Sequence, residues 1–284
     1  MIRVNLHTHS TKSDGKLKPS ELVERLYSDG VKVISLTDHD TICGLSEAKK
    51  TARKLNMGFI SGIEISTDIS ELKVDFLDSI NNTIHLLGLG FDIEKFQRFM
   101  NEKQEEKIAR IKHLIIQLNE DGYNIIPKDI IKKKSDVAKL LVDHGYAKDA
   151  QDAFNSIINN YYDRHIDNYR FSDVINIMHS CGGVVIWAHP FEILLGIYKQ
   201  SISINQIDLM CGILKPHDID GIEVYYGKYT SEQKKQLKKL KDKYNFISSA
   251  GTDYHAKSSN EKTYYEIDQN LIEEVLKLKD TMEN

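Results

Sequence analysis

Histidines and acidic residues recur at the ends of apolar, strand-like runs of this chain. His7 and His9 follow the first such run, and residues two apart in an extended segment face the same side, so both imidazoles can point at one ion. Later runs carry or precede the same residue types, at Asp38, His39, Asp40, Glu64, His85, His189, Asp253 and His255. Imidazole and carboxylate ligands together suit Mn, Fe or Zn better than Ca or Mg. Because these donors exceed what one ion needs, the pattern predicts two or three divalent ions, with Mn the first candidate.

The strand-like runs must bring these side chains together. Seven apolar runs predict strands that are buried on both faces, at residues 2–6, 31–36, 59–65, 84–89, 184–188, 221–225 and 246–249. Helical patterns at Pro19–Ser28 and 44–55 separate the first three, and repeated β-α-β units are typical of an α/β fold. Seven strands with helices between them predict a barrel-like closure, short of the usual eight strands. Barrel enzymes place their active sites at the C-terminal ends of the strands, where most candidate ligands fall.

The alternation of strands and helices stops between about residues 94 and 181. One long helical pattern covers 94–122, with Ile108, Ile111, Ile115 and Leu118 at helical spacing. Shorter helices are predicted around 127–133, 136–144 and 149–160. We therefore expect residues 1–93 and 166–284 to form the barrel domain, and 94–165 to form a helical insertion that caps the active site.

The composition is that of an ordinary globular protein, with 284 residues, 40% of them hydrophobic and 28% charged. A net charge of −4 argues against binding of long nucleic acid. Without a bilayer-length apolar run or a signal-type N-terminus, we expect a cytoplasmic protein with no membrane contact and no obligate protein partner. The three cysteines indicate neither a disulfide framework nor a CxxC zinc site. Lysines crowd 128–139 and 234–243, either as solvated helix faces or as a basic rim over a small anionic substrate.

Seven motifs of this sequence together resemble the polymerase and histidinol phosphatase (PHP) family of amidohydrolase-like enzymes. They are HTHSTKSDG, LTDHDT, GIEIS, IHLLGLGF, WAHP, GIEVYY and GTDYHA, in this order over nearly the whole chain. The resemblance implies a distorted, TIM-like barrel of seven strands, with the insertion between strands four and five and a trinuclear metal site. Carried over by position, the first ion is held by His7, His9, Glu64 and Asp253, the second by Glu64, His85 and His189, and the third by Asp14, His39 and His255.

Within the family, the sequence is most similar to nucleoside 3′,5′-bisphosphate phosphatases and short-oligonucleotide 5′-exonucleases. In these proteins basic and imidazole groups of the insertion bind the substrate phosphate. Arg110 matches the arginine of their long helix, whereas their Arg-x-His pattern becomes Lys134-Ser135-Asp136 here. Lysine keeps the charge but loses the bidentate fork of arginine, and Asp136 would repel a phosphate. Arg110 and Lys134 are thus the expected substrate-binding residues, while the segment 159–170 also departs from the family pattern.

The resemblance implies hydrolysis of a phosphate monoester on a nucleoside 3′,5′-bisphosphate or a short 5′-phosphorylated oligonucleotide. The expected mechanism is in-line attack by a hydroxide that bridges two ions, with the third ion on a phosphate oxygen. His189 or His255, both also expected ligands, could protonate the leaving alkoxide. Asp38 is predicted to fix the tautomer of an imidazole. Asp40 is predicted either to do the same or to cap the helix that follows.

Three other functions are compatible with the same motifs. Two are enzymatic, a histidinol-phosphate phosphatase and a phosphodiesterase for cyclic or diester phosphates, and the metal ligands do not separate mono- from diester activity. The third is a non-catalytic PHP scaffold that binds metal. All nine expected ligand positions are present, which argues against the scaffold.

Overall fold

The structure is a computed structural model that divides into two compact units. It describes residues 1–284 except 75, 77–81, 128–130, 132, 162–167, 196–199 and 279–284. The first unit comprises Met1–Phe96 and Tyr169–Asn284, and the second comprises Gln97–Asn168. The predicted domain boundary at 165–166 lies outside the described residues, and the capping role of the insertion stays a prediction.

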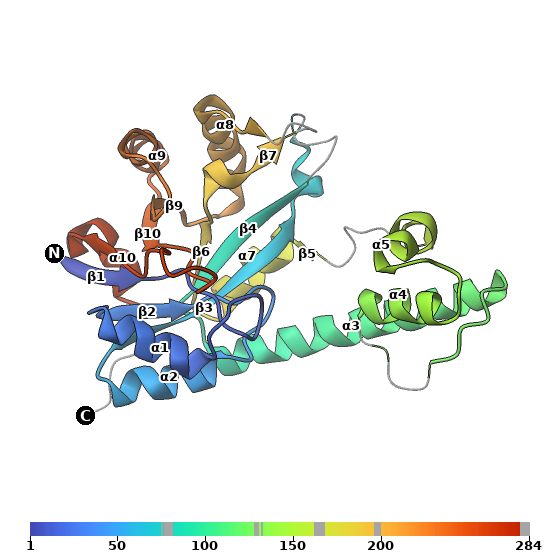
Figure 1. Cartoon of the computed structure of the whole chain (residues 1–284). Coiled ribbons are helices and arrows are strands. Elements are labelled where there is room, and N and C mark those ends of the chain that lie inside the picture. The colour runs from blue at the N-terminus through green and yellow to red at the C-terminus, as the bar shows by residue number, and fades with distance from the viewer. Residues whose placement is uncertain are drawn as a thin grey trace. The chain divides into compact units, whose positions relative to one another are not determined.

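The first unit is built on one mixed sheet, whose strands follow the order β10-β9-β6-β4-β3-β2-β1-β11 (Figure 1). The seven predicted strands are β1 (Ile2–Asn5), β2 (Val33–Leu36), β3 (Gly58–Asp68), β4 (Thr83–Leu89), β6 (Val184–Trp187), β9 (Gly221–Tyr226) and β10 (Ile247–Gly251). Between β1 and β10, the amide of Leu6 donates to the carbonyl of Ala250 at 3.0 Å, and Thr8 forms an isolated bridge with Tyr254. The sheet is therefore a nearly closed barrel, and the predicted α/β class with a distorted barrel is confirmed.

This sheet also contains short strands that are not among the seven predicted ones. β11 (Tyr265–Ile267) pairs antiparallel with β1, and β5 (Tyr169–Arg170) pairs with the end of β3. A separate two-stranded sheet joins β7 (Leu194–Leu195) to β8 (Gln200–Ser201).

The direction of β4 differs from the β-α-β pattern that the sequence suggests. β4 runs antiparallel to both of its neighbours, β3 and β6, whereas β1–β2, β2–β3, β6–β9 and β9–β10 are parallel pairs. Consequently the beginning of β4, rather than its end, lies beside the C-terminal end of β3. His85, near the start of β4, is in register with Ser66, two residues beyond Glu64.

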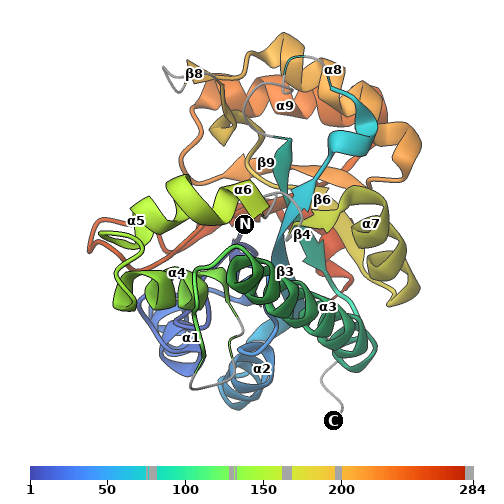
Figure 2. The same cartoon turned by 90° about the vertical axis from the view of Figure 1, so that its right-hand side faces the viewer.

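Helices surround the strands of the first unit (Figure 2). They are α1 (Pro19–Ser28), α2 (Leu45–Lys54), α7 (Phe171–Ser180), α8 (Ile204–Leu214), α9 (Ser231–Tyr244) and α10 (Glu273–Leu276), with 3-10 turns at Ser70–Leu72, Pro190–Glu192, Lys215–His217 and Gln269–Ile272. α1 begins with Pro19, where a missing N–H costs no hydrogen bond, and the Glu21 carboxylate accepts from the amide of Lys18. Its buried face carries Leu22, Val23 and Leu26.

The core of the barrel is a cluster to which the strands contribute in turn. Its members include Val4, Val33, Ile60, Leu87, Ile186 and Ala250, and Val275 and Leu276 of α10 pack with them. Full burial of an aliphatic side chain of this size stabilises a fold by about 1.5–3 kcal/mol. The strand ends that carry polar side chains are thus held by a rigid apolar base.

The second unit is entirely helical in its described part. It contains most of α3 (Ile93–Glu120), α4 (Lys134–Asp143), α5 (Ala150–Ala153), a π-helical turn (Phe154–Ile158) and α6 (Asn159–Tyr161). Its own apolar core includes Ile111, Leu118, Val137, Leu141 and Ile158. Of the helix predicted at 127–133, residues 128–130 and 132 lie outside the described residues. No described helix of either unit is both long and apolar enough to cross a membrane.

Candidate metal centre

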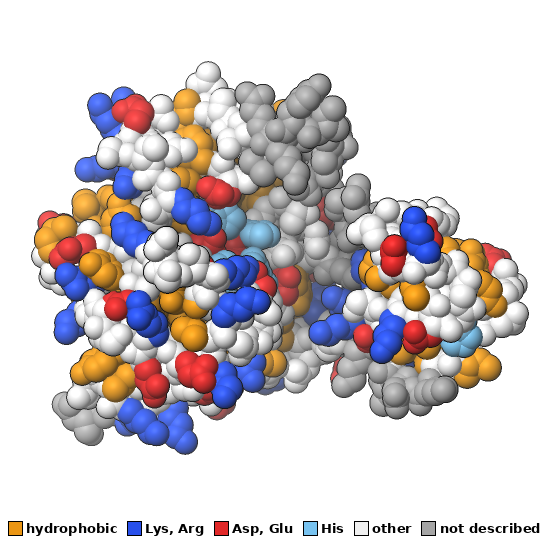
Figure 3. Space-filling view, in the orientation of Figure 1, with side chains coloured by type: hydrophobic (Ala, Val, Ile, Leu, Met, Phe, Trp, Pro, Cys, Tyr) orange, Lys and Arg blue, Asp and Glu red, His pale blue; other side chains and the backbone are white. Residues whose placement is uncertain are grey.

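The nine predicted metal ligands all lie in the first unit and form one connected cluster. Figure 3 shows histidine side chains in a hollow of the surface, with acidic and basic side chains beside them. His7 and His9 follow β1, His39 follows β2, Glu64 lies within β3 and His85 within β4. His189 follows β6, and Asp253 and His255 follow β10. Asp14 comes from the loop after His9, so the cluster draws on most strands of the barrel.

Glu64 lies at the centre of the cluster and is completely buried. Its Oε1 atom is 2.9 Å from Nδ1 of His85 and 2.8 Å from Nε2 of His189. The partners of Oε2 are Nε2 of His7 at 3.1 Å, Nε2 of His9 at 3.1 Å and Nδ1 of His39 at 3.3 Å. Each carboxylate oxygen therefore faces a different set of imidazoles, which is the arrangement of a ligand that can bridge two ions.

Three groups of side chains have ligand atoms close enough to share an ion, all within 4.8 Å of one another in each group. The groups are His7, His9, Glu64 and Asp253; His9, Asp14, His39 and His255; and His39, Glu64 and His85. The first is the set predicted for the first ion, and the second adds His9 to the set predicted for the third. The third group differs from the set predicted for the second ion, because it contains His39 in place of His189. His189 contacts Glu64 without belonging to this group. The clusters are consistent with a site for several ions, and which residue holds which ion stays a proposal.

The residues of the cluster fit divalent cations. Both ring nitrogens of His9 are buried without a hydrogen bond to any described residue, although Nε2 lies 3.1 Å from Oδ1 of Asp253. Buried polar atoms are normally satisfied by a hydrogen bond, so unpaired imidazole nitrogens next to carboxylates indicate a missing partner. Neutral imidazoles and carboxylates are the donors that Mn, Fe and Zn prefer.

In the cluster, burial and neighbouring charges shift the pKa values of the ligands in opposite directions. Burial alone would raise the pKa of Glu64, but His7 and hydrogen bonds from His189, His7 and His85 hold this pKa well below its ordinary value. Burial would lower the pKa of His7, yet the carboxylates of Glu64 and Glu223 raise it well above the ordinary value. The same opposition raises the pKa of His9 and of His85. For His39 burial prevails, and its pKa falls to about 4.

We expect metal binding to release protons at pH 7. The pKa values of His7, His9 and His85 are raised, so these imidazoles hold a proton more strongly than an ordinary histidine, whereas coordination requires neutral imidazole. His39 is already neutral at this pH and contributes no proton. Calorimetric titration with Mn²⁺ in two buffers of different ionisation enthalpy measures the release, and the metal affinity should fall as the pH is lowered. Equal binding enthalpies in the two buffers would contradict the expectation.

Glu223 is an important residue of the site that the sequence analysis missed. It is completely buried on β9, and its carboxylate oxygens lie 3.1 and 3.3 Å from Nδ1 of His7. It also accepts the backbone N–H of His189 at 2.8 Å, where the chain has a φ of +27°. A carboxylate can only accept, so Nδ1 of His7 carries a hydrogen, and Nε2 is the nitrogen that would bind metal. The sequence does contain a signal for this residue, which is the acid inside the apolar run GIEVYY. Because glutamate is almost never buried unpaired, an acid in a buried strand predicts a partner nearby.

Asp38 does not play the predicted role of fixing an imidazole. Its carboxylate accepts hydrogen bonds from the amide of Ser10 at 2.7 Å, the hydroxyl of Ser10 at 2.7 Å and the hydroxyl of Ser13 at 2.6 Å. Successive residues of an extended segment point to opposite sides, so Asp38 faces away from the side that His39 takes. Asp38 therefore positions the loop that leads to Asp14. Asp40 accepts the amide of Ser66 at 2.9 Å and helps to raise the pKa of His85, so its predicted role beside an imidazole stays a prediction, while the N-cap of α2 is Gly44.

His189 and His255 lie at the edge of the cluster. Their side chains are 15% and 13% exposed, whereas those of His7 and His9 are fully buried. Nδ1 of His255 is 2.9 Å from the carbonyl oxygen of Asp253 and must donate to it, which leaves Nε2 facing Asp14 at 3.0 Å. Both histidines are thus placed where a substrate can reach them, and their role in proton transfer stays a proposal.

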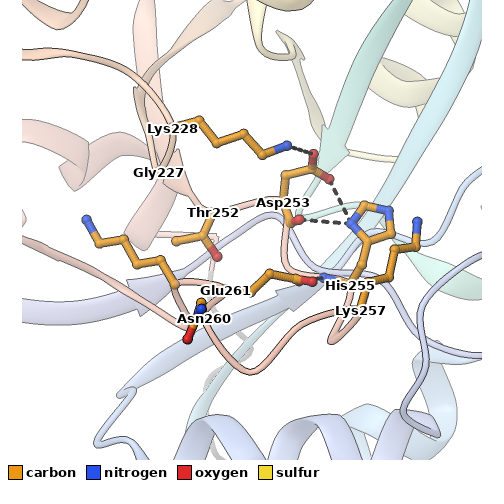
Figure 4. Close-up of a pocket in the computed structure, with 9 residues that line it drawn as sticks. Gly227, Lys228, Thr252, Asp253, His255, Lys257, Asn260 and Glu261 are labelled. Atoms are coloured by element: carbon orange, nitrogen blue, oxygen red, sulfur yellow. Dashed lines mark hydrogen bonds and ion pairs between the residues drawn. The ribbon is translucent and has the colours of Figure 1, made fainter.

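Two lysines at the rim are paired with the ligand carboxylates. Lys228 Nζ lies 3.2 Å from Oδ2 of Asp253, which also accepts from the hydroxyl of Tyr226 at 2.8 Å, and Lys257 Nζ lies 2.6 Å from Oδ2 of Asp14. In both acids the other oxygen, Oδ1, faces imidazoles. Figure 4 shows the amine of Lys228 directed at Asp253, with His255 beside it.

The two predicted substrate-binding residues belong to the second unit. Arg110 lies on α3, where its Nη1 is 3.7 Å from Oε2 of Glu106, and Lys134 is the first residue of α4. Asp136, the departure from the family pattern, accepts the amide of Lys133 and so closes the N-terminus of α4. Of the divergent segment 159–170, residues 162–167 lie outside the described residues. The binding roles of Arg110 and Lys134 stay predictions.

Comparisons with known proteins relate the chain to phosphate-ester enzymes. The family model of the PHP domain matches residues 5–281. The chain is 28% identical over 266 residues to a 5′-3′ exoribonuclease of Haemophilus influenzae, covering 89% of this chain and 90% of that protein. It is 24% identical over 268 residues to a 3′,5′-nucleoside bisphosphate phosphatase of Chromobacterium violaceum, covering 90% and 88%. A solved amidohydrolase from Chromobacterium violaceum, with bound sulfate and no metal, has the same fold, with a TM-score of 0.64, 22% identity and coverage of 97% and 96%.

Proposed function

Because the chain belongs to the PHP domain family of metal-dependent phosphoesterases, we propose that its substrates are nucleoside 3′,5′-bisphosphates or short 5′-phosphorylated oligonucleotides. The observation that carries the proposal is the buried cluster around Glu64, which brings together six histidines and three carboxylates. The relatives named as a bisphosphate phosphatase and an exoribonuclease support the nucleotide class.

The nine clustered side chains would hold two or three divalent ions, proposed to be Mn²⁺. Such ions would neutralise phosphate oxygens and make a water molecule a stronger nucleophile near neutral pH. The protein fixes the ligands before substrate arrives, because Glu64 and Glu223 orient the imidazoles and Asp38 orients the loop of Asp14. This preorganisation is the chief contribution of a protein to metal-assisted hydrolysis.

The partly exposed histidines supply the remaining chemistry in this proposal. The leaving alkoxide needs a proton, and His189 or His255 is proposed to provide it, since both are partly exposed and each contacts a carboxylate of the cluster, Glu64 for His189 and Asp14 for His255. Arg110 and Lys134 of the second unit are proposed to bind substrate phosphate, with residues 94–165 covering the site. An arginine pairs with phosphate oxygens through two parallel hydrogen bonds.

A substrate panel with Mn²⁺ tests the proposal. It contains adenosine 3′,5′-bisphosphate, AMP, a 5′-phosphorylated trinucleotide, histidinol phosphate and a chromogenic diester, with phosphate release or diester cleavage as the measurement. We expect the bisphosphate or the trinucleotide to give the highest kcat/KM, and metal-free protein to be inactive. A preference for histidinol phosphate or for the diester would contradict the nucleotide proposal and favour the corresponding enzyme. No activity on any of the five substrates, with metal bound, would favour a non-catalytic scaffold.

A further inference from the structure

A pocket of about 480 Å³ opens directly beside the metal cluster (Figure 4). Two of the residues that line it, Asp253 and His255, belong to the cluster itself. The rest of the lining includes three lysines, Lys228, Lys257 and Lys262, all from loops of the first unit. A substrate held at the cluster can therefore extend into this pocket without leaving the protein surface.

The lining of the pocket is net cationic, because it carries three lysines and two acids, Asp253 and Glu261. The oxygens of Glu261 accept the amide of His255 at 2.9 Å and the amide of Ser258 at 2.8 Å. These bonds hold the loop after β10. The acids paired with Lys228 and Lys257 are Asp253 and Asp14, which are proposed metal ligands. Ions at the site would offset the negative charge of both carboxylates, which leaves the two ammonium groups able to bind a further anion.

Lys262 lacks even such a partner. It forms no ion pair with any residue in the described ranges, and its Nζ lies 4.5 Å from the ring centroid of Tyr265. Partial burial and the nearby Lys234 lower the pKa of Lys262, as expected for an ammonium group without a neighbouring anion. A ligand that brings a negative charge next to Lys262 would stabilise its ammonium form.

We propose that this pocket is the subsite for a second phosphate of the substrate, with Lys228 and Lys262 as its cationic walls. The inference rests on the proposed function and places the recognition of doubly phosphorylated substrates in the barrel itself. The reacting phosphate lies at the cluster, and the second phosphate lies among the lysines. A phosphate monoester at the end of a bisphosphate and the backbone diester of an oligonucleotide share this chemistry.

Selectivity measurements with a matched set of lysine variants test the subsite. The ratio of kcat/KM for adenosine 3′,5′-bisphosphate to that for adenosine 3′-phosphate should fall about tenfold in Lys262→Met, the effect of losing one charged hydrogen bond. Lys228→Met should lower it similarly, and Lys262→Arg should restore most of it. Lys239→Met, on the exposed face of α9, removes the same charge elsewhere and should keep the wild-type ratio. Methionine retains the aliphatic stem, so each variant removes the charge alone.

Two further measurements distinguish a failure of the subsite from a failure of the proposed function. The 5′-phosphorylated trinucleotide reports whether the subsite also takes a backbone diester, since its kcat/KM would then fall with that of the bisphosphate. An unchanged ratio in both Lys262→Met and Lys228→Met would overturn the subsite and leave the proposed function standing. If the wild type hydrolyses neither the adenosine phosphates nor the trinucleotide, the proposed function fails, and calorimetric binding of the bisphosphate to the Mn²⁺-loaded protein decides the inference. Weaker binding in Lys262→Met than in Lys239→Met supports it, and equal binding contradicts it.

Discussion

Replacing Glu64 by glutamine is expected to lower phosphate-ester hydrolysis by about a thousandfold and to reduce the number of bound metal ions. The two carboxylate oxygens contact five imidazoles, and no solvent reaches them. Glutamine keeps the shape but removes the negative charge, and its amide group places a donor where a ligand oxygen is needed. A bound metal ion supplies several kcal/mol of transition-state stabilisation, and a loss of about 4 kcal/mol corresponds to roughly a thousandfold in rate.

The measurements for Glu64→Gln are kcat/KM with Mn²⁺ and metal content by mass spectrometry. Thermal unfolding in the presence of a chelator should also shift to lower temperature, because His7, His9 and His85 lose the central carboxylate that raises their pKa values. Glu24→Gln, on the exposed surface of α1, is the matched control. Activity and metal content that stay within a few-fold of the wild type would exclude Glu64 as the shared ligand.

The types and spacing of the residues were enough to predict the α/β class and most of the residues that gather at the site, and the family resemblance added Asp14. His7-Thr8-His9 is informative because an extended chain forces both rings to one side. Glu64 within β3, and His189 and Asp253 just after β6 and β10, belong to strands that a barrel brings together. The structure places all nine predicted ligands in one cluster. Local patterns sufficed here because each of these residues is positioned by the strand in which it lies or which it follows.

Features that depend on contacts between distant segments were not predictable in the same way. An apolar run does not encode its direction, so the antiparallel course of β4, and with it the position of His85, appears only in the folded chain. Asp38 has the residue type of a histidine partner, but its neighbours in space are Ser10 and Ser13. Lys228 and Lys257 reach the site from loops whose path no periodicity predicts.

Glu223→Gln is the second variant for which a large effect is expected, a loss of about ten- to a hundred-fold in Mn²⁺ affinity. Glu223 fixes the hydrogen of His7 on Nδ1 and makes Nε2, which faces Glu64, a better ligand. Glutamine can present an oxygen to Nδ1, but it removes the charge that raises the basicity of the ring. Part of the loss should therefore be recovered at high Mn²⁺ concentration, in contrast to Glu64→Gln, where the ligand itself is removed.

A purely structural role of Glu223 would give a different result. The same carboxylate accepts the N–H of His189, which stands in the left-handed region of backbone conformation, so its loss could loosen the chain there. In that case the unfolding temperature of the metal-free protein would fall while the Mn²⁺ affinity of the folded protein stayed at the wild-type value. Titration of Mn²⁺ binding together with thermal unfolding in chelator separates the two. A fall in affinity that exceeds any change in stability assigns to Glu223 the orientation of His7, and thus a direct part in building the metal centre.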